Sequence, residues 1–262
     1  MEPFSKFPSD QKARIKYILT DIDDTLTCGG RLSAIVFTAM ERLQATGLRI
    51  FPITGRPAGW CDHIARMWPV DGLVGENGAF YFRYDRARKT MIRRYWKTAA
   101  ERGQDREKLE LLKAEILDKI PECAVSADQA YREADLAIDF CEDVPPLPPQ
   151  RIADIVNLFE AAGAHAKVSS IHVNGWFGDY DKLAMTRILF QESCDLAIDE
   201  NREHILFIGD SPNDSPMFNF FSHSVGVANV LDFKDQLTFA PTWVTARKGG
   251  HGFAEMVEHL LA

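Results

Sequence analysis

Alternating hydrophobic and polar segments divide the chain into short strands and longer helices. The run Tyr17 to Thr20 is apolar and ends at a cluster of acids, a pattern typical of a buried parallel strand. Residues 33–46 carry hydrophobic side chains at helical spacing, and Gly47 follows as a helix stop before the apolar run 48–53. These segments predict a β-α-β unit.

The same rhythm continues to about residue 80 and resumes after residue 181. The expected helices are 58–67 and 182–193, and the expected strands are 72–74, 204–208 and 224–227. Strands that alternate with helices in this way predict a doubly wound parallel sheet.

Between these two parts the parallel pattern is interrupted. The elements expected there are a hairpin at 79–84 and 90–96, helices at 103–120 and 150–162, and strands at 136–140, 166–169 and 171–176. The sequence therefore predicts an α/β fold with a Rossmann-like core formed by residues 1–80 and 181–262. An α+β cap domain, residues 81–180, is inserted into that core.

Composition and charge exclude several classes of protein. The 262 residues are 46% hydrophobic and 26% charged, as in an ordinary globular protein. A formal charge of -8 gives no electrostatic reason to expect nucleic acid or an anionic membrane as partner. The five cysteines form no C-x-x-C pair, and no segment is apolar enough for a signal peptide or a membrane span. We expect a soluble cytoplasmic protein, a monomer or a homodimer.

Polar clusters follow three of the expected strands. They are Asp21 with Asp23, the run 54–56, and the run 209–214. Because ligands of open α/β sheets bind at the carboxyl ends of the strands, we expect these clusters to meet. Two close carboxylates repel each other unless a divalent cation lies between them, and oxygen ligands favour magnesium. An aspartate can also accept a phosphoryl group while a second acid protonates the leaving oxygen.

Each cluster also has an ordinary structural explanation when it is taken alone. Asp21 and Asp23 are compatible with a capping acid and a turn acid, and the run 209–214 is compatible with an Asx-rich turn. Thr54 suits a helix N-cap, and Lys182 lies at the start of an expected helix. Only the combination of the clusters favours chemistry.

Four runs, together and in this order, resemble the motifs of the haloacid dehalogenase superfamily. They are Asp21-Ile22-Asp23-Asp24-Thr25-Leu26, Thr54-Gly55-Arg56, Asp181-Lys182 and Gly209-Asp210-Ser211-Pro212-Asn213-Asp214. The insertion between the second and third motifs resembles subfamily IIB, the branch with a large α/β cap. That branch contains Cof-type, sucrose-phosphate, trehalose-phosphate and mannosyl-phosphoglycerate phosphatases, and phosphomannomutase. The run from Gly75 to Ala79 also resembles this branch.

The resemblance implies roles for the carboxylates. Asp21 is the expected nucleophile, and Asp23 is the expected general acid and base, which also binds magnesium through its main-chain carbonyl. Asp210 is expected to bind the metal directly, and Asp214 is expected to support the metal through water or through Lys182. The position of Asp24 is often glycine in the family.

The resemblance also implies contacts with the phosphoryl group. Thr54 and the backbone amide of Gly55 are expected to bind its oxygens, and Lys182 is expected to neutralise its charge and to hold Asp21 in place. Asn213 is expected to position the loop and the substrate. Two readings of Arg56 remain open, a solvated surface cation or a partner for a second anionic group on the substrate or the cap.

Specificity is expected to come from the cap. Ser170, His172 and Asn174 alternate along an expected strand and therefore share one face. Relatives place residues that contact the leaving group in this segment, although a lone histidine is more often structural. Asn77, in the run before the cap, is a further candidate for substrate binding.

These expectations favour a magnesium-dependent phosphatase that hydrolyses a small phosphorylated metabolite through an aspartyl-phosphate. The family suggests a sugar phosphate as the substrate. A phosphomutase that uses the same nucleophile is the alternative enzyme, and a phosphoaccepting signalling domain is the alternative outside catalysis. The inserted cap and the second acid Asp23 argue against the signalling domain, because a signalling acceptor needs no leaving-group acid.

Overall fold

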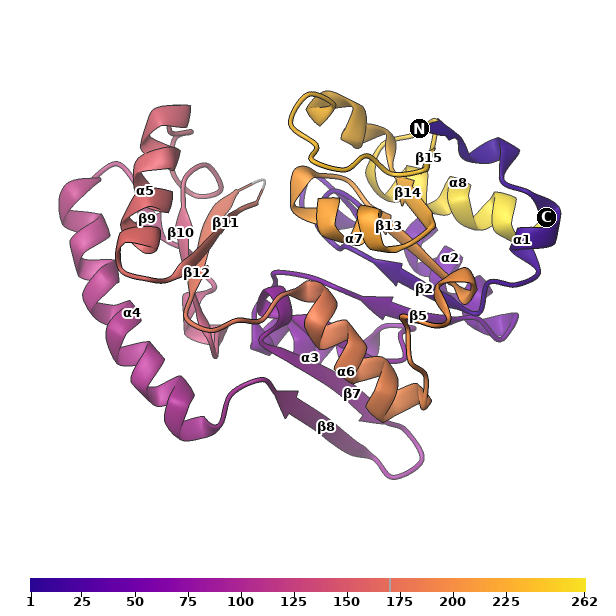
Figure 1. Ribbon diagram of the computed structural model, residues 1–262, viewed down its shortest axis with the longest axis horizontal. Helices are drawn as coiled ribbons and strands as arrows, with labels where there is room; N and C mark the ends of the chain where they lie inside the picture. The colour runs from indigo at the N-terminus through magenta and orange to yellow at the C-terminus, as the bar shows by residue number, and fades with distance from the viewer. Residues whose placement is uncertain (170) are drawn as a thin grey trace.

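The computed structural model of the chain describes residues 1–169 and 171–262. Its centre is a six-stranded parallel sheet flanked by helices (Figure 1). In spatial order the strands are β1 (Glu2–Pro3), β15 (Trp243–Val244), β14 (His223–Gly226), β13 (Ile205–Gly209), β2 (Tyr17–Thr20) and β5 (Arg49–Pro52). The predicted α/β fold with a parallel sheet is confirmed.

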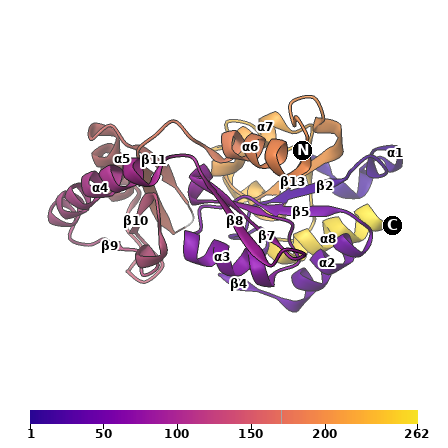
Figure 2. The ribbon, with the colours of Figure 1, turned by 90° about the horizontal axis from the view of Figure 1, so that it is seen from below.

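Helices cover both faces of this sheet (Figure 2). One face carries α2 (Ala34–Ala45), α3 (Ala58–Met67) and α8 (Gly249–Leu261), and the other carries α6 (Lys182–Cys194) and α7 (Ser215–Phe220). Two separate hydrophobic clusters fill the spaces between the sheet and these helices. We call the six-stranded sheet and these five helices the core.

Strand β2 lies where the order of the strands reverses. The next strand of the sheet along the chain, β5, pairs with one edge of β2, and β13 pairs with the other edge after the chain has left the core and returned. Loops that follow β2, β5 and β13 therefore diverge from one another and leave room for a ligand. The first and last polar clusters, at Asp21 and Asp210, follow β2 and β13 directly.

A hairpin extends the core beside β5. Strand β6 (Leu73–Gly75) pairs with β7 (Phe80–Asp85), and β7 pairs with β8 (Thr90–Tyr95). Phe80 and Phe82 of the hairpin are buried in the same hydrophobic cluster as α3. The division at residues 80 and 181 stays a prediction, and this packing favours a first boundary near Trp96.

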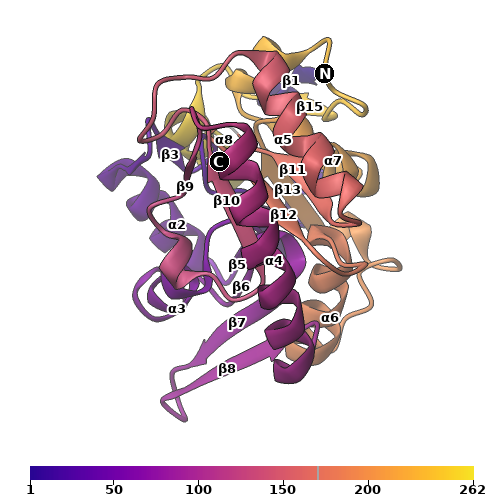
Figure 3. The same ribbon diagram turned by 90° about the vertical axis from the view of Figure 1, so that its left-hand side faces the viewer.

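A second, antiparallel sheet stands apart from the core. Its order is β11 (His165–Val168), β12 (His172–Trp176), β10 (Asp135–Asp139) and β9 (Ala124–Val125). Helices α4 (Ala99–Lys119) and α5 (Pro149–Ala161) cover its outer face (Figure 3). We call this sheet and its two helices the cap.

The cap sheet has one apolar and one polar face. Leu136, Ile138 and Val173 lie in a hydrophobic cluster with α4 and α5. Because side chains alternate along a strand, His172 and Asn174 belong to the opposite face, toward the core. The fold therefore directs the polar side of the cap sheet to the carboxyl edge of the core sheet.

Several short elements complete the fold. They are α1 (Ser9–Lys12), β3 (Thr27–Cys28), β4 (Arg31–Leu32) and short 3₁₀ helices at 4–6, 76–78, 129–131, 202–204, 212–214 and 228–233. In the described parts of the chain, no helix has both the length and the apolar character needed to cross a membrane.

Candidate active site

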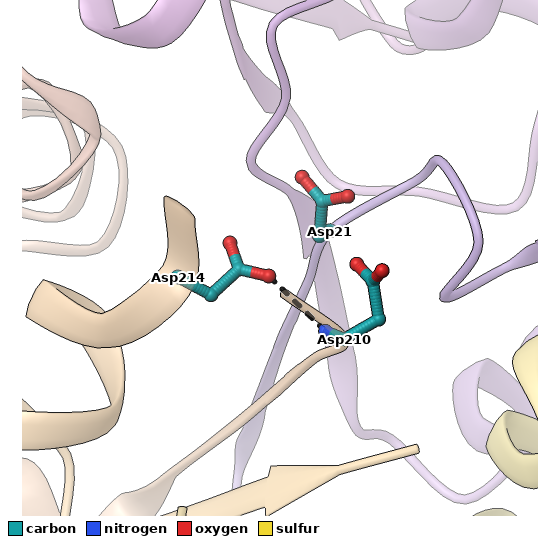
Figure 4. A group of neighbouring side chains, drawn as sticks. All are labelled: Asp21, Asp210 and Asp214. Atoms are coloured by element: carbon teal, nitrogen blue, oxygen red, sulfur yellow. Dashed lines mark hydrogen bonds between the residues drawn. The ribbon is translucent and has the colours of Figure 1, made fainter. Parts of the chain in front are cut away.

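Three aspartates converge at the carboxyl edge of the core sheet (Figure 4). Asp21 follows β2, Asp210 follows β13, and Asp214 lies one turn after Asp210. Each offers a carboxylate oxygen, and these oxygens lie within 4.8 Å of one another. The predicted meeting of the polar clusters after β2 and β13 is thus seen in the structure.

Backbone contacts fix the loops that carry these acids. The amide of Asp21 donates to the carbonyl of Ile208 at 3.0 Å, which ties the loop after β2 to β13. The amide of Asp210 donates to Asp214 Oδ2 at 3.1 Å. A Cβ atom on Gly209 would lie 2.4 Å from this same Oδ2, so the turn requires glycine at that position.

Lys182 is the cation beneath the cluster. Its Nζ lies 2.8 Å from Asp21 Oδ1 and 3.0 Å from Asp214 Oδ1. Burial opposes its charge, but the two carboxylates raise the pKa of Lys182 further above its ordinary value. The side chain of Asp181 caps α6 by accepting from the amide of Ala184 at 2.7 Å, so the helix start holds the lysine in place.

The cluster carries more negative charge than Lys182 can balance. Burial raises the pKa of Asp21 to about 7; the charge of Lys182 opposes this shift and the charge of Asp214 adds to it. Burial, followed by the charges of Asp214 and Asp21, also raises the pKa of Asp210 well above its ordinary value. Buried carboxylates that share too few counter-charges suit a divalent cation, and hard oxygen donors fit magnesium. The residues present therefore fit the predicted metal.

Thr54 and Gly55 lie beside the cluster, in the loop after β5. Thr54 is fully buried, and its Oγ1 accepts from the amide of Arg56 at 3.1 Å. It is not a helix N-cap, because α3 begins at Ala58 with Pro57 as the cap residue. Gly55 lies against Asn77, whose side-chain atoms would be 3.2 Å from a Cβ at that position.

Arg56 is buried and binds Asp23. Its Nε lies 2.9 Å from Asp23 Oδ2, and its Nη2 lies 2.7 Å from Asp23 Oδ1. The guanidinium also lies 4.5 Å from the ring centre of Trp60 and 3.7 Å, through Nη1, from Asp128 Oδ2 in the cap. With only 7% of Arg56 exposed, the reading of a solvated surface cation fails, and the cap supplies its second anionic partner.

A cleft between the core and the cap joins most of the predicted residues. The predicted residues that line it are Asp21, Asp23, Gly55, Arg56, Asn77, His172, Asn174, Asp210 and Asn213. Thr54, Lys182 and Asp214 are buried and do not line this cleft. The candidate Ser170 lies outside the described residues.

The cap wall of the cleft holds two predicted residues on β12. Asn174 donates through Nδ2 to Asp135 Oδ2 at 3.1 Å. The Nε2 atom of His172 lies 2.9 Å from Glu142 Oε2, although the angle is outside hydrogen-bond geometry. Burial, followed by the nearby charge of Arg132, lowers the pKa of His172 to about 4, so this histidine is neutral at pH 7.

Sequence reasoning assigned no role to Arg132 or Lys167. Arg132 lines the cleft, and its guanidinium is paired with Asp128 and Asp135 at 3.0 Å each. Lys167 also lines the cleft, directly opposite Asn174 in the cap sheet. The close spacing of Asp128, Arg132 and Asp135 is a sequence signal that could have indicated such a cluster, although not its place over the core.

A buried carboxylate joins the cap to the core beside the cleft. Glu76 accepts from the backbone amides of Ala58 at 2.9 Å, Glu133 at 2.9 Å and Ala134 at 2.7 Å. In the opposite direction, Arg132 donates to the carbonyl of Gly55 at 3.1 Å. These bonds seat the cap segment 126–135, which runs from the end of β9 to the first residue of β10, on the loops of the core.

The backbone at Asp24 explains why the family resemblance leads us to expect glycine at this position. Its φ angle is 54°, in the left-handed region that glycine adopts most easily. Aspartate is among the residues that tolerate this region. The carbonyl of Asp24 also accepts from Asn229 Nδ2 at 2.8 Å, which helps to hold the turn.

Solved structures with a similar fold cover nearly the whole chain. A Thermoplasma acidophilum protein aligns over 94% of this chain and 98% of its own, with a TM-score of 0.71 and 20% identity. The sucrose-phosphatase of Synechocystis, solved with sucrose and phosphate, aligns over 93% and 97%, with a TM-score of 0.64 and 16% identity. A sugar phosphatase of haloacid dehalogenase subclass IIB aligns over 93% and 98%, with a TM-score of 0.62 and 15% identity.

No protein-family model and no curated protein matches the sequence. Because these three solved structures share at most 20% sequence identity with the chain, their similarity shows its fold. The chain has the fold of these phosphatases over nearly its whole length, cap included.

Proposed function

We propose that this chain is a magnesium-dependent phosphatase that hydrolyses a small phosphorylated metabolite, in the class of sugar phosphates. The observation that carries the proposal is the buried cluster of Asp21, Asp210 and Asp214 with Lys182. It lies where the strand order reverses, at one side of a cleft that Asp23 also lines. One ligand in this cleft would reach both the proposed nucleophile Asp21 and the proposed second acid Asp23.

The proposed reaction has two steps on this chain's own residues. In the first, a carboxylate oxygen of Asp21 forms a bond to phosphorus while the bond from phosphorus to the leaving oxygen breaks. Asp23 gives its proton to that oxygen. In the second, Asp23 takes a proton from a water molecule, whose oxygen attacks phosphorus and releases Asp21 and inorganic phosphate.

The surrounding residues would hold the phosphoryl group. Lys182, the hydroxyl of Thr54 and the amide of Gly55 offer positive charge and hydrogen-bond donors for oxygens whose charge is spread over the transferring group. The lysine also lies 2.8 Å from Asp21, which supports its role in orienting the nucleophile.

Magnesium would be held by Asp21, Asp210 and Asp214 and by the main-chain carbonyl of Asp23. When bound, it would neutralise charge on the phosphoryl oxygens and on the crowded carboxylates. The raised pKa values of Asp21, at about 7, and of Asp210 support this assignment, because a cation would favour the ionised forms that the reaction needs.

The leaving group would face the polar side of the cap. His172, Asn174, Lys167 and Arg132 line that side, together with the apolar Ile171. Side chains with hydrogen-bonding groups suit a leaving group rich in hydroxyls, such as a sugar or polyol.

A panel of phosphate esters tests the proposal. Purified protein with magnesium is expected to release inorganic phosphate from at least one phosphorylated sugar, polyol or glycerate, and a chelator is expected to stop the release reversibly. A phosphomutase would instead give isomerised sugar phosphate without free phosphate. Release of no phosphate from any ester of the panel in the presence of magnesium would contradict the proposal.

A further inference from the structure

Ion pairs connect the cap to the second acid of the site. Arg132 holds Asp128, with Nε 3.0 Å from Oδ1. The other oxygen of Asp128 lies 3.7 Å from Arg56 Nη1. Arg56 in turn binds both carboxylate oxygens of Asp23. The contacts are continuous from the cap segment 126–135 to a residue that lines the cleft.

The cap end of this chain of contacts is rigidly seated. Arg132 has only 7% of its surface exposed and is also paired with Asp135 at 3.0 Å. Ser126 donates through its hydroxyl to Asp128 Oδ1 at 2.6 Å. Glu76 and Gly55 of the core bind the same segment through the backbone and Arg132 bonds described above. Asp128 therefore offers Arg56 a fixed partner.

The orientation of Asp23 depends on Arg56. A guanidinium that binds both oxygens of a carboxylate fixes the plane of that carboxylate as well as its distance. Asp23 is less buried than Arg56, with 30% of its side chain exposed against 8%, so few other contacts restrain it. Proton transfer to a leaving oxygen requires the acid within hydrogen-bond reach, which makes its rotation matter.

We propose that Asp128, held by Arg132, is a positioning residue that fixes Arg56 and thereby orients Asp23. The cap then contributes to the acid step as well as to specificity, because Asp23 is correctly oriented only while segment 126–135 is seated on the core. This inference rests on the proposed function, in which Asp23 protonates the leaving group.

Leaving-group dependence separates this role from a merely structural one. An alkyl ester such as glucose 6-phosphate, or the fastest alkyl ester of the panel, needs a proton on its leaving oxygen, whereas p-nitrophenyl phosphate releases a stable anion. Asp128→Asn is expected to lower kcat/KM for the alkyl ester about tenfold more than for the aryl ester. A general loss of structure would lower both alike.

The chain offers a matched control. Asp105 is also a buried acid of the cap, 7% exposed against 8% for Asp128, and it is paired with Lys97 at 2.5 Å, away from the cleft. Asp105→Asn is expected to leave the ratio of the two kcat/KM values unchanged. In a double variant with Arg56→Lys, Asp128→Asn is expected to change the ratio no further, because the two residues act in one series.

Arg132→Lys provides a second route if Asp128→Asn does not fold. It keeps the charge but loses the fork that holds Asp128, and it is expected to shift the ratio in the same direction. Folding of each variant is checked by circular dichroism. An unchanged ratio in the folded variants of an active enzyme would overturn this inference alone, and so would equal losses on both esters. A wild-type protein without phosphatase activity would instead count against the proposed function.

Discussion

The two walls of the cleft balance their charges in different ways. On the core side, Asp21, Asp210 and Asp214 share one lysine, and burial leaves the pKa of Asp21 at about 7. On the cap side, Arg132 is paired with acids of its own segment, Asp128 and Asp135. The core wall thus has more carboxylates than cations, whereas the two acids of the cap wall each contact a guanidinium. We therefore expect the chemistry on the core wall, and we expect the cap wall to provide shape and orientation.

Removal of the proposed nucleophile is expected to have the largest effect, and it acts on the core wall. Asp21→Asn is expected to lower the rate of phosphate release by about four orders of magnitude, because an amide cannot accept the phosphoryl group. Without magnesium, its melting temperature is expected to equal or exceed that of the wild type, because one crowded charge is gone.

The surface variant Asp199→Asn is the control for this change. Its ion pair with Arg187 is exposed, and neither rate nor melting temperature is expected to change beyond measurement error. Calorimetry and a phosphate-release assay check both variants. Retention of about a tenth of the wild-type rate by Asp21→Asn would contradict the role of Asp21.

Substitution of Glu76 is expected to remove hydrogen bonds that connect the core and the cap. Glu76→Ala leaves the amides of Ala58, Glu133 and Ala134 without their buried acceptor. The free energy of unfolding is expected to fall by about 3 kcal/mol. Glu133→Ala is the control, because that side chain is 39% exposed, and its effect is expected to stay within about 0.5 kcal/mol. Urea denaturation measures the free energy of unfolding of both variants. Equal losses would contradict the role of Glu76 in holding the cap on the core.

Low pH is expected to reduce the stability of the protein through His172 of the cap wall. The pKa of His172 is lowered from 6.5 to about 4, so between these values the unfolded chain binds a proton that the folded chain does not. The contribution of His172 to the free energy of unfolding is therefore fully present above pH 6.5 and is lost as the pH falls toward 4. The slope from this group is up to about 1.4 kcal/mol per pH unit.

His172→Gln is expected to remove that part of the slope. The exposed His165 serves as the control, and His165→Gln is expected to leave the slope as it is. Urea denaturation at a series of pH values between 7 and 4 supplies the comparison. An identical slope in wild type and His172→Gln would contradict the buried, neutral state of this histidine.

The smallest effect is expected at the turn after the nucleophile. Asp24 has a φ angle of 54°, which costs a β-branched residue about 1–2 kcal/mol. Asp24→Val is therefore expected to be less stable than Asp24→Gly by about this amount, with Asp24→Gly within about 1 kcal/mol of the wild type. Thermal unfolding of both variants without magnesium makes the measurement, and the reverse order would contradict the backbone assignment.

Much of the fold was predictable from local patterns. The bounds of β2 and α3 agree with prediction, because each has a clear hydrophobic pattern and a clear stop. Helix α8 was not predicted, since Gly249, Gly250 and Gly252 at its start disfavour a helix. Gly250 is needed there because a Cβ would lie 2.6 Å from the carbonyl of Leu26. Helix α4 begins at residue 99, before its hydrophobic repeat, because Thr98 and Glu101 form a capping box.

The core wall of the site was more predictable from the sequence than the cap wall. Asp21 and Asp210 were predictable because the ends of neighbouring parallel strands must meet. Asp128 and Arg132 were not, because they lie on a turn whose place over the core depends on long-range contacts such as that of Glu76. The partner of Arg56 stayed open for the same reason. The candidate residues of the core wall can be predicted from local sequence patterns, whereas those of the cap wall depend on tertiary packing.

Detection of a covalent phosphoryl adduct on Asp21 tests whether this residue is the nucleophile. The protein is mixed with magnesium and its best phosphate ester, quenched in acid during turnover, digested, and analysed by mass spectrometry. Asp23→Asn is included because it is expected to slow dephosphorylation and to increase the adduct. We expect one phosphoryl group on the peptide that contains Asp21, and none in Asp21→Asn. Steady release of phosphate with no phosphoryl group on that peptide, in either protein, would contradict this expectation.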